Sequence, residues 1–338
     1  MSFVKVYSKE DILPLLKKRA GETKFGEEIG FVKTVKDLKN HPAKYVLLGI
    51  PEDIGVRANH GNQGTSKAWK ASLGSILNIQ HNPLTDAQNM LILGEIDCET
   101  QMKQAESISK EENHYVEKLG ELVSQIDHKV CEVIKTIVEA KKFPIIIGGG
   151  HNNSYGIIKG VSQALQNPIN CINFDAHTDF RSLEHRHSGN GFSYAFEEGF
   201  LGNYFIFGLH RNYTSKAVFN SIEEHSKRIK FNLFETISIR KELSFFDALQ
   251  EAEKCCSNEN FGIELDLDAI ECMGSSAISP SGFSLNEARN FVAYFSKNSN
   301  ASYLHICEGS PEAEIFPNQV GKAIAYLVSD VISEKYNL

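Results

Sequence analysis

Short apolar runs alternate with longer amphipathic segments through most of the chain, and this alternation constrains the fold more than any other feature. Each run has the length and composition of a buried strand, and turn-forming or acidic residues follow it. Residues 115–140 repeat apolar side chains every three or four positions, which predicts a long amphipathic helix between two such strands. The strands are expected at 45–50, 91–97, 144–147, 171–174, 203–208, 261–265 and 301–307.

Strands that alternate with helices predict β-α-β units and a parallel sheet. The fold class is therefore α/β, with helices on both faces of a central, mostly parallel sheet. The chain has no internal repeat, low-complexity tract or linker, so residues 1–338 are expected to form a single catalytic domain. Within it, residues 1–43 would supply an N-terminal helix, over 8–19, and a connector. Further helices are expected at 66–77, 153–165, 244–256, 284–297 and 320–331.

Three side chains that could bind a metal lie close together after the strand predicted at 171–174. They are Asp175, His177 and Asp179, in the run Asp-Ala-His-Thr-Asp. An extended backbone would point these alternating side chains to one side. Two carboxylates and an imidazole suit a hard or borderline divalent cation, Mn²⁺ in particular. Alone, the run is equally compatible with an acidic surface loop.

Two other predicted strands end in groups of the same kind. His151 follows three glycines after the strand at 144–147, and Asp266 and Asp268 follow the strand at 261–265. In open α/β sheets, ligands bind at the carboxyl ends of the strands. Two histidines and four aspartates are too many for one cation that also holds water and substrate. They suit two metals that share bridging carboxylates, about 3.5–4 Å apart.

The composition excludes several classes of partner. The formal net charge of -8 and the lack of a basic tract argue against nucleic acid as the main partner. No segment approaches 18 continuous apolar residues and the first residues have no apolar signal sequence, so no membrane partner is expected. The 7 cysteines are scattered without a Cys-x-x-Cys pair. We expect them to be reduced, buried thiols in a cytoplasmic protein.

The three strand-end motifs together resemble those of the ureohydrolase family, which comprises arginases, agmatinases and formimidoylglutamases. The family typically has Gly-Gly-x-His, Asp-Ala-His-x-Asp and Ser-x-Asp-x-Asp, in this order. The corresponding segments here are Gly149-Gly150-His151, Asp175-Ala-His-Thr-Asp179 and Glu264-Leu-Asp266-Leu-Asp268. The resemblance extends from about Tyr45 to the end of the chain. It implies an arginase-like three-layer α/β/α sandwich and, as cofactor, two Mn²⁺ ions.

The resemblance also implies which residues hold each metal. One Mn²⁺ would be bound by His151, Asp175, Asp179 and Asp266, and the other by His177, Asp175, Asp266 and Asp268. Asp175 and Asp266 would then bridge the two ions. A water between the metals would have its pKa lowered enough to attack an amidine or guanidine carbon as hydroxide.

Two carboxylates are expected to act on the reactants. Asp179 would accept a hydrogen bond from the attacking hydroxide and orient it. Glu308 begins the segment Glu-Gly-Ser-Pro, which resembles the family's Glu-Val-Asn-Pro. Its carboxylate would pair with the cationic N–C–N group of the substrate.

The residues after the acidic run indicate the type of small-molecule substrate. Arg181 stands where the formimidoylglutamases typically have arginine, and its guanidinium would bind a substrate carboxylate. The segment Ser188-Gly-Asn190-Gly-Phe resembles the Ser-Gly-Thr-x-Phe of the same subfamily, so Ser188 and Asn190 are further candidates for substrate binding. The best hypothesis is hydrolysis of N-formimino-L-glutamate to L-glutamate and formamide, a step of histidine catabolism.

The chain departs from the family pattern at several positions. Ser188 occupies the usual position of a proton-shuttling histidine, and the adjacent His187 is the candidate shuttle. Glu264 replaces the family's serine or threonine. These departures leave two alternatives to the hydrolysis of N-formimino-L-glutamate. The protein would be another guanidino or amidino hydrolase, arginase- or agmatinase-like, or a metal-binding paralogue without activity. Family resemblance also implies a homo-oligomer.

Overall fold

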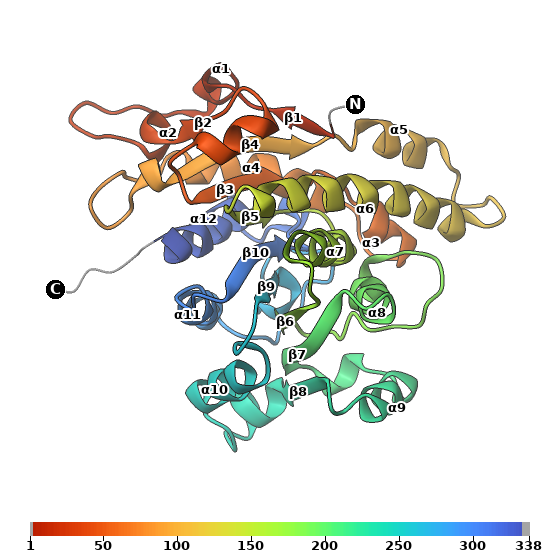
Figure 1. Ribbon diagram of the computed structural model, residues 1–338. Coiled ribbons are helices and arrows are strands. Elements are labelled where there is room, and N and C mark those ends of the chain that lie inside the picture. The colour runs from red at the N-terminus through yellow and green to blue at the C-terminus, as the bar shows by residue number, and fades with distance from the viewer. Residues whose placement is uncertain (1–2, 333–338) are drawn as a thin grey trace.

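The computed structural model describes residues 3–332, and ten strands within this range form one sheet. The strands are β1 (Val4–Val6), β2 (Gly30–Phe31), β3 (Tyr45–Gly49), β4 (Met90–Ile96), β5 (Phe143–Ile147), β6 (Ile169–Phe174), β7 (Leu201–Leu209), β8 (Ile229–Leu233), β9 (Phe261–Asp266) and β10 (Ala301–Cys307). Their order is β1-β4-β3-β5-β10-β9-β6-β7-β8, and β2 also pairs with β4 (Figure 1). Only β1 is antiparallel to its neighbour among these described strands.

Helices cover both faces of the sheet (Figure 1). The α-helices are α1 (Lys9–Ile12), α2 (Phe25–Glu28), α3 (Ile54–Ala58), α4 (Ala68–Ile76), α5 (Glu99–Ser107), α6 (Tyr115–Glu139), α7 (Asn153–Leu165), α8 (Gly191–Glu197), α9 (Lys216–Glu224), α10 (Phe245–Cys256), α11 (Leu285–Phe295) and α12 (Gln319–Ile332). The predicted α/β fold with a mostly parallel sheet between helical layers is therefore confirmed.

Two apolar cores lie on opposite faces of the sheet. Successive residues of β5 show the division, because Ile145 and Ile147 belong to one core and Ile146 belongs to the other. The first core also contains side chains of α4, α10, α11 and α12, and the second contains side chains of α3 and of α5 to α9. This alternation follows from the two-residue repeat of a strand, and it explains why the central strands read as continuous apolar runs.

The long helices agree closely with the sequence pattern. The helix predicted over 115–140 is α6, Tyr115–Glu139, and the helix predicted over 153–165 is α7. Buried residues of α6 recur at three- and four-residue intervals, so the helix lies along the sheet with one apolar face.

The N-terminal segment differs from the prediction. The helix expected over 8–19 ends early, because α1 stops at Ile12 and a 3₁₀ turn that contains Pro14 follows. Residues 3–43 also contain β1 and β2, in the region where the sequence predicts a helix and a connector. Both strands are two or three residues long, too short to produce a recognisable pattern. The prediction of a single domain stays a prediction.

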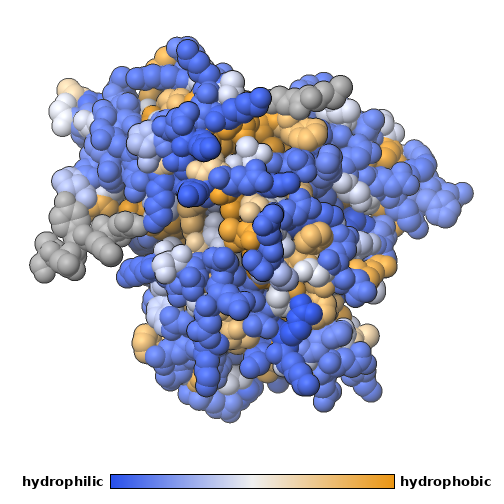
Figure 2. All heavy atoms as spheres, viewed as in Figure 1, coloured by the Kyte–Doolittle hydropathy of each residue, from blue (hydrophilic) through white to orange (hydrophobic). Residues whose placement is uncertain are grey.

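The surface in Figure 2 is mostly hydrophilic, with hydrophobic residues in small groups between the polar ones. Among the described helices, none is both long enough and apolar enough to cross a membrane. The seven cysteines are all free. Contrary to the expectation of buried thiols, Cys272 is exposed and Cys255 is half-buried.

The central position of β10 predicts the cost of a cavity there. Leu304 is fully buried, and its Cα pairs with Ile145 of β5 on one side and Ile263 of β9 on the other. Leu304→Ala should lower the free energy of unfolding by about 2–5 kcal/mol, because the packed sheet cannot collapse around the lost methyl groups. The measurement is urea-induced unfolding followed by circular dichroism.

The matched control is Leu84→Ala, since Leu84 is 57% exposed. Its effect should stay within about 0.5 kcal/mol. Equal losses for the two variants would contradict the central, close-packed position of β10.

Candidate metal centre

Four neighbouring strands bring the candidate residues to one edge of the sheet. The order β5-β10-β9-β6 places these strands side by side, and all three pairs are parallel. Their registers align Ile147 with Ile306, Cys307 with Asp266, and Phe174 with Leu265, so their carboxyl ends lie level. The loops that follow the strands carry His151, Asp175 to Asp179, Asp268 and Glu308.

Four of the predicted ligands converge on one point. Nδ1 of His151 lies 3.2 Å from Oδ2 of Asp175, 2.8 Å from Oδ2 of Asp179 and 3.1 Å from Oδ2 of Asp266. One ring nitrogen cannot donate a proton to three carboxylates. The imidazole and three aspartates instead form a group whose ligand-capable atoms all lie within 4.8 Å of one another. The predicted ligands are therefore brought together.

The remaining two predicted ligands complete a second group beside the first. Ligand-capable atoms of His177, Asp266 and Asp268 also lie within 4.8 Å of one another, so Asp266 belongs to both groups. Nδ1 of His177 is 3.5 Å from Oδ1 of Asp175, while Oδ2 of Asp175 faces His151. Asp175 and Asp266 thus contact both groups, as expected for bridging carboxylates.

Bound cations would stabilise the carboxylates of the two histidine and aspartate groups in their ionised form. Burial, together with the carboxylates of Asp268 and Asp175, raises the pKa of Asp266 well above its usual value. Burial and Asp175 likewise raise the pKa of Asp179. Crowded buried carboxylates are stable as anions only beside cations. Two imidazoles and four carboxylates form a donor set suited to hard or borderline divalent ions, so these residues fit a pair of Mn²⁺ ions.

Strained backbone occurs at two of the candidate residues. Asp179 has φ 43° and Glu308 has φ 59°, in the left-handed region that side-chain-bearing residues rarely adopt. Such conformations persist where surrounding contacts enforce them, and they concentrate at functional sites. Gly149, with φ 77°, makes the turn before His151, and a Cβ there would lie 2.4 Å from the side chain of Asn153.

A buried carboxylate that the sequence reading did not single out holds this turn in place. Glu52 is fully buried, and its Oε1 accepts hydrogen bonds from the backbone N–H of Gly150 at 3.0 Å and from Asn153 Nδ2 at 2.6 Å. Its Oε2 accepts a hydrogen bond from the N–H of Ile54 at 2.8 Å. Glu52 therefore joins the start of α3 to the loop that carries His151. The one sequence feature that could have identified Glu52 is its position directly after the end of a predicted strand, in Pro51-Glu52.

Glu308 directly follows β10, and its carboxylate is buried. Its Oε1 accepts a hydrogen bond from the backbone N–H of His151 at 2.7 Å. Its Oε2 is buried and has no hydrogen-bond partner among the described residues. Burial and the carboxylate of Asp268 raise the pKa of Glu308 to about 8. A buried carboxylate with one unsatisfied oxygen is suited to bind a cation.

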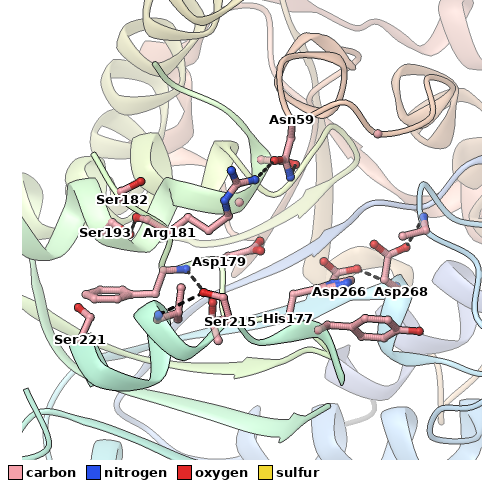
Figure 3. A pocket seen from close by; sticks show the side chains of 18 of the residues that line it. Asn59, His177, Asp179, Arg181, Ser182, Ser193, Ser215, Ser221, Asp266 and Asp268 are labelled. Carbon is pink, nitrogen blue, oxygen red and sulfur yellow. Dashed lines mark hydrogen bonds between the residues drawn. The ribbon is translucent and has the colours of Figure 1, made fainter. Parts of the chain in front are cut away.

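A cavity of about 760 Å³ extends from the metal-ligand groups (Figure 3). Its lining includes Glu308, Arg181, Ser188 and Asn59. Arg181 is half-exposed and donates hydrogen bonds to Oδ1 of Asn59 and to Oε1 of Glu184, the latter at 3.0 Å. Nδ2 of Asn59 donates to Oγ of Ser188 at 3.1 Å. Asn59 comes from a polar, glycine-containing loop, and nothing in its local sequence identified it.

The structure does not place the other two candidates in the cavity lining. Both ring nitrogens of His187 are occupied, because Nδ1 accepts a hydrogen bond from the N–H of Gly189 and Nε2 lies 3.0 Å from Glu184 Oε1. Burial lowers its pKa to about 4. Asn190 is fully buried. Its Nδ2 donates a hydrogen bond to the carbonyl oxygen of His185, and its Oδ1 accepts one from the guanidinium of Arg186. The roles predicted for His187 and Asn190 stay predictions that the geometry does not support.

Comparisons with known proteins agree on one family. A model described as the Arginase family matches residues 43–333. A formimidoylglutamase of Macrococcus caseolyticus (strain JCSC5402) is 25% identical over 275 residues, which cover 80% of this chain and 78% of that protein.

Two solved structures share the fold. A formimidoylglutamase from Bacillus subtilis has a TM-score of 0.75 at 19% identity and covers 96% of this chain and 98% of its own. A Trypanosoma cruzi formiminoglutamase determined with Mn²⁺ has a TM-score of 0.72 at 19% identity and covers 92% of this chain and 97% of its own. Because the family model spans most of the sequence, the chain belongs to the arginase family.

Proposed function

We propose that this protein is a binuclear Mn²⁺ hydrolase that cleaves the amidine C–N bond of N-formimino-L-glutamate. The observation that carries the proposal is the presence of three complementary groups in one cavity. These are the aspartate and histidine cluster, the unsatisfied oxygen of Glu308 and the guanidinium of Arg181. The names of the relatives support the same substrate, since those compared above are formimidoylglutamases or formiminoglutamases.

The donor set divides between two ions through its shared aspartates. His151, Asp175, Asp179 and Asp266 would hold one Mn²⁺, and His177, Asp175, Asp266 and Asp268 would hold the other. When bound, such a pair lowers the pKa of a water molecule and stabilises the negative charge that develops during attack.

The side chains of the cavity then position the reactants. A carboxylate oxygen of Asp179 accepts a hydrogen bond from the attacking water and orients it toward the amidine carbon. Oε2 of Glu308 pairs with an N–H of the cationic amidine, and Arg181 binds a carboxylate of the glutamate part. Water adds to the amidine carbon, the bond from that carbon to the glutamate nitrogen breaks, and this nitrogen takes up a proton. The products are L-glutamate and formamide.

Arg181 also separates this reaction from those of related substrates. Agmatine is cationic and has no carboxylate, so the guanidinium of Arg181 would repel it. Arginine has a single carboxylate and a larger guanidino group. A dicarboxylate with a small amidine therefore fits the charges of the cavity best.

The function is tested by comparing substrates. Protein loaded with Mn²⁺ should release glutamate from N-formimino-L-glutamate and produce no urea from arginine or agmatine. Hydrolysis of arginine or agmatine instead would assign the protein to another amidino or guanidino hydrolase activity. Two bound Mn²⁺ ions without turnover of any of the three compounds would favour a metal-binding paralogue.

The role of Arg181 predicts a change in KM more than in kcat. Arg181→Ala should raise the KM for N-formimino-L-glutamate about 10–100-fold, because a charged hydrogen bond to the substrate is worth about 1.5–3 kcal/mol. Arg181→Lys should recover part of this loss, since it restores the charge without the planar fork. The matched control is Arg240→Ala, because Arg240 lies outside the cavity and pairs with Glu242. An unchanged KM in Arg181→Ala would exclude the carboxylate-binding role.

Asp266 contacts both ligand groups, so its loss should affect both metals. Asp266→Asn should reduce bound Mn²⁺ below two equivalents per chain and abolish turnover, measured by elemental analysis after dialysis and by steady-state assay. Asp127→Asn is the matched control, since Asp127 is a buried aspartate that pairs with Arg186 outside the cluster. Retention of both metals in Asp266→Asn would contradict the bridging role.

A further inference from the structure

A second layer of buried polar residues lies beneath the metal centre, inside the sheet. Glu264 of β9 and His305 of β10 are in register on adjacent strands, and both are fully buried. Tyr303 lies on the same face of β10, two residues before His305, and is also fully buried. Burying a carboxylate inside a sheet costs free energy unless nearby groups hydrogen-bond to it. The partners of the Glu264 carboxylate therefore indicate why it is buried there.

The carboxylate of Glu264 is fixed at both of its oxygens. The hydroxyl of Tyr303 donates a hydrogen bond to Oε1 at 2.7 Å, and Nδ1 of His305 lies 2.6 Å from Oε2. A carboxylate bound at both ends has a defined orientation. Oε2 of this carboxylate also lies 3.3 Å from Nε2 of His151.

The two ring nitrogens of His151 have different surroundings. Nδ1 is within 3.2 Å of three aspartate oxygens, so it is the nitrogen placed to bind a metal. A metal-binding nitrogen must be unprotonated, and the ring proton of the neutral imidazole then resides on Nε2. Nε2 is buried and has no well-aligned hydrogen-bond partner among residues 3–332. The carboxylate oxygen Oε2 of Glu264 lies 3.3 Å from this nitrogen.

We propose that Glu264 is a positioning residue for the metal centre. Its carboxylate attracts the Nε2 proton of His151, which orients the ring and leaves Nδ1 free to bind Mn²⁺. A carboxylate behind a ligating histidine also increases the basicity of the ligand, and removing such a partner typically costs 10–100-fold in metal affinity. The inference rests on the proposed function, because it requires a metal bound by His151.

The thiol of Cys307 also lies beside this imidazole. The ligand-capable atoms of His151, His305 and Cys307 lie within 4.8 Å of one another. The thiol is directed to the carbonyl oxygen of Leu265, at 3.7 Å, and a neutral thiol is a weak acceptor. Cys307→Ala is therefore a suitable matched control, since it changes a buried side chain beside the same ring without removing a charge.

The experiment measures Mn²⁺ affinity of the metal-free protein by isothermal titration calorimetry at fixed pH. Glu264→Gln should weaken one of two Mn²⁺ sites about 10–100-fold and change the other less than about threefold. Tyr303→Phe, which removes one contact that fixes Glu264, should give a smaller loss. Cys307→Ala should bind both ions as the unaltered protein does.

A double-mutant cycle separates positioning from a general structural effect. Glu264→Gln should have no further effect on the remaining site in a His151→Gln background, because the ring that it positions is absent. It should retain its full effect in a His177→Gln background. Equal effects of Glu264→Gln in both backgrounds would mean that Glu264 supports the fold in general, and the proposal would be wrong.

The other outcomes are equally decisive. If the unaltered protein binds two Mn²⁺ ions and Glu264→Gln binds them with unchanged affinities, the positioning role is excluded while the proposed function stands. If the unaltered protein binds a third ion that is lost in Glu264→Gln, Glu264 is itself a ligand and the positioning role is again excluded. If the unaltered protein binds no Mn²⁺, the proposed function and this inference both fail.

Discussion

Mutual repulsion among buried carboxylates is the constraint on which the rest of the structure depends. Asp175, Asp179, Asp266 and Asp268 meet at the carboxyl ends of adjacent parallel strands, where the register holds their backbones level. A rigid sheet can hold these like-charged side chains close together, because its backbone hydrogen bonds fix the strand ends regardless of the charges that they carry. Under the proposed function, metal ions would complete the balance of charge that the chain alone leaves incomplete.

Polar residues around the candidate ligands also hold the ligand side chains and their loops in position. Glu52 holds the loop before His151 from one side, and Glu264 contacts the imidazole of His151 from another. Asn173 donates to Oδ2 of Asp175 and to the hydroxyl of Tyr204. Buried polar contacts therefore surround the candidate ligands and limit the movement of their side chains and loops.

The sequence predicted the central strands because apolar runs are local patterns, and it identified the six candidate ligands because they come at or directly after the ends of these strands. Apolar runs identify strands that are buried on both faces, and the residues that follow these runs must lie at the carboxyl ends of the strands. The sequence did not predict β8, because only Ile229 and Asn232 of its five residues are buried and its short run has no continuous apolar pattern. The roles of His187 and Asn190 stay predictions, and both side chains lie outside the cavity lining because spacing along a loop does not determine which side chains face a cavity. Asn59 meets Arg181 across 122 residues, a contact set by packing and not by local sequence.

The position of β10 has a consequence for the order in which the molecule can form. Among residues 3–332, β10 is the last strand along the chain, yet it lies between β5 and β9 in the middle of the sheet. During synthesis, β5 and β9 are complete before the strand that joins them has left the ribosome, so their inner edges stay unpaired until then. Unpaired parallel edges favour association with other chains. Glu308 directly follows this strand, so a nascent chain acquires both the strand that joins the two halves of the sheet and the last lining residue of the cavity when this segment is made.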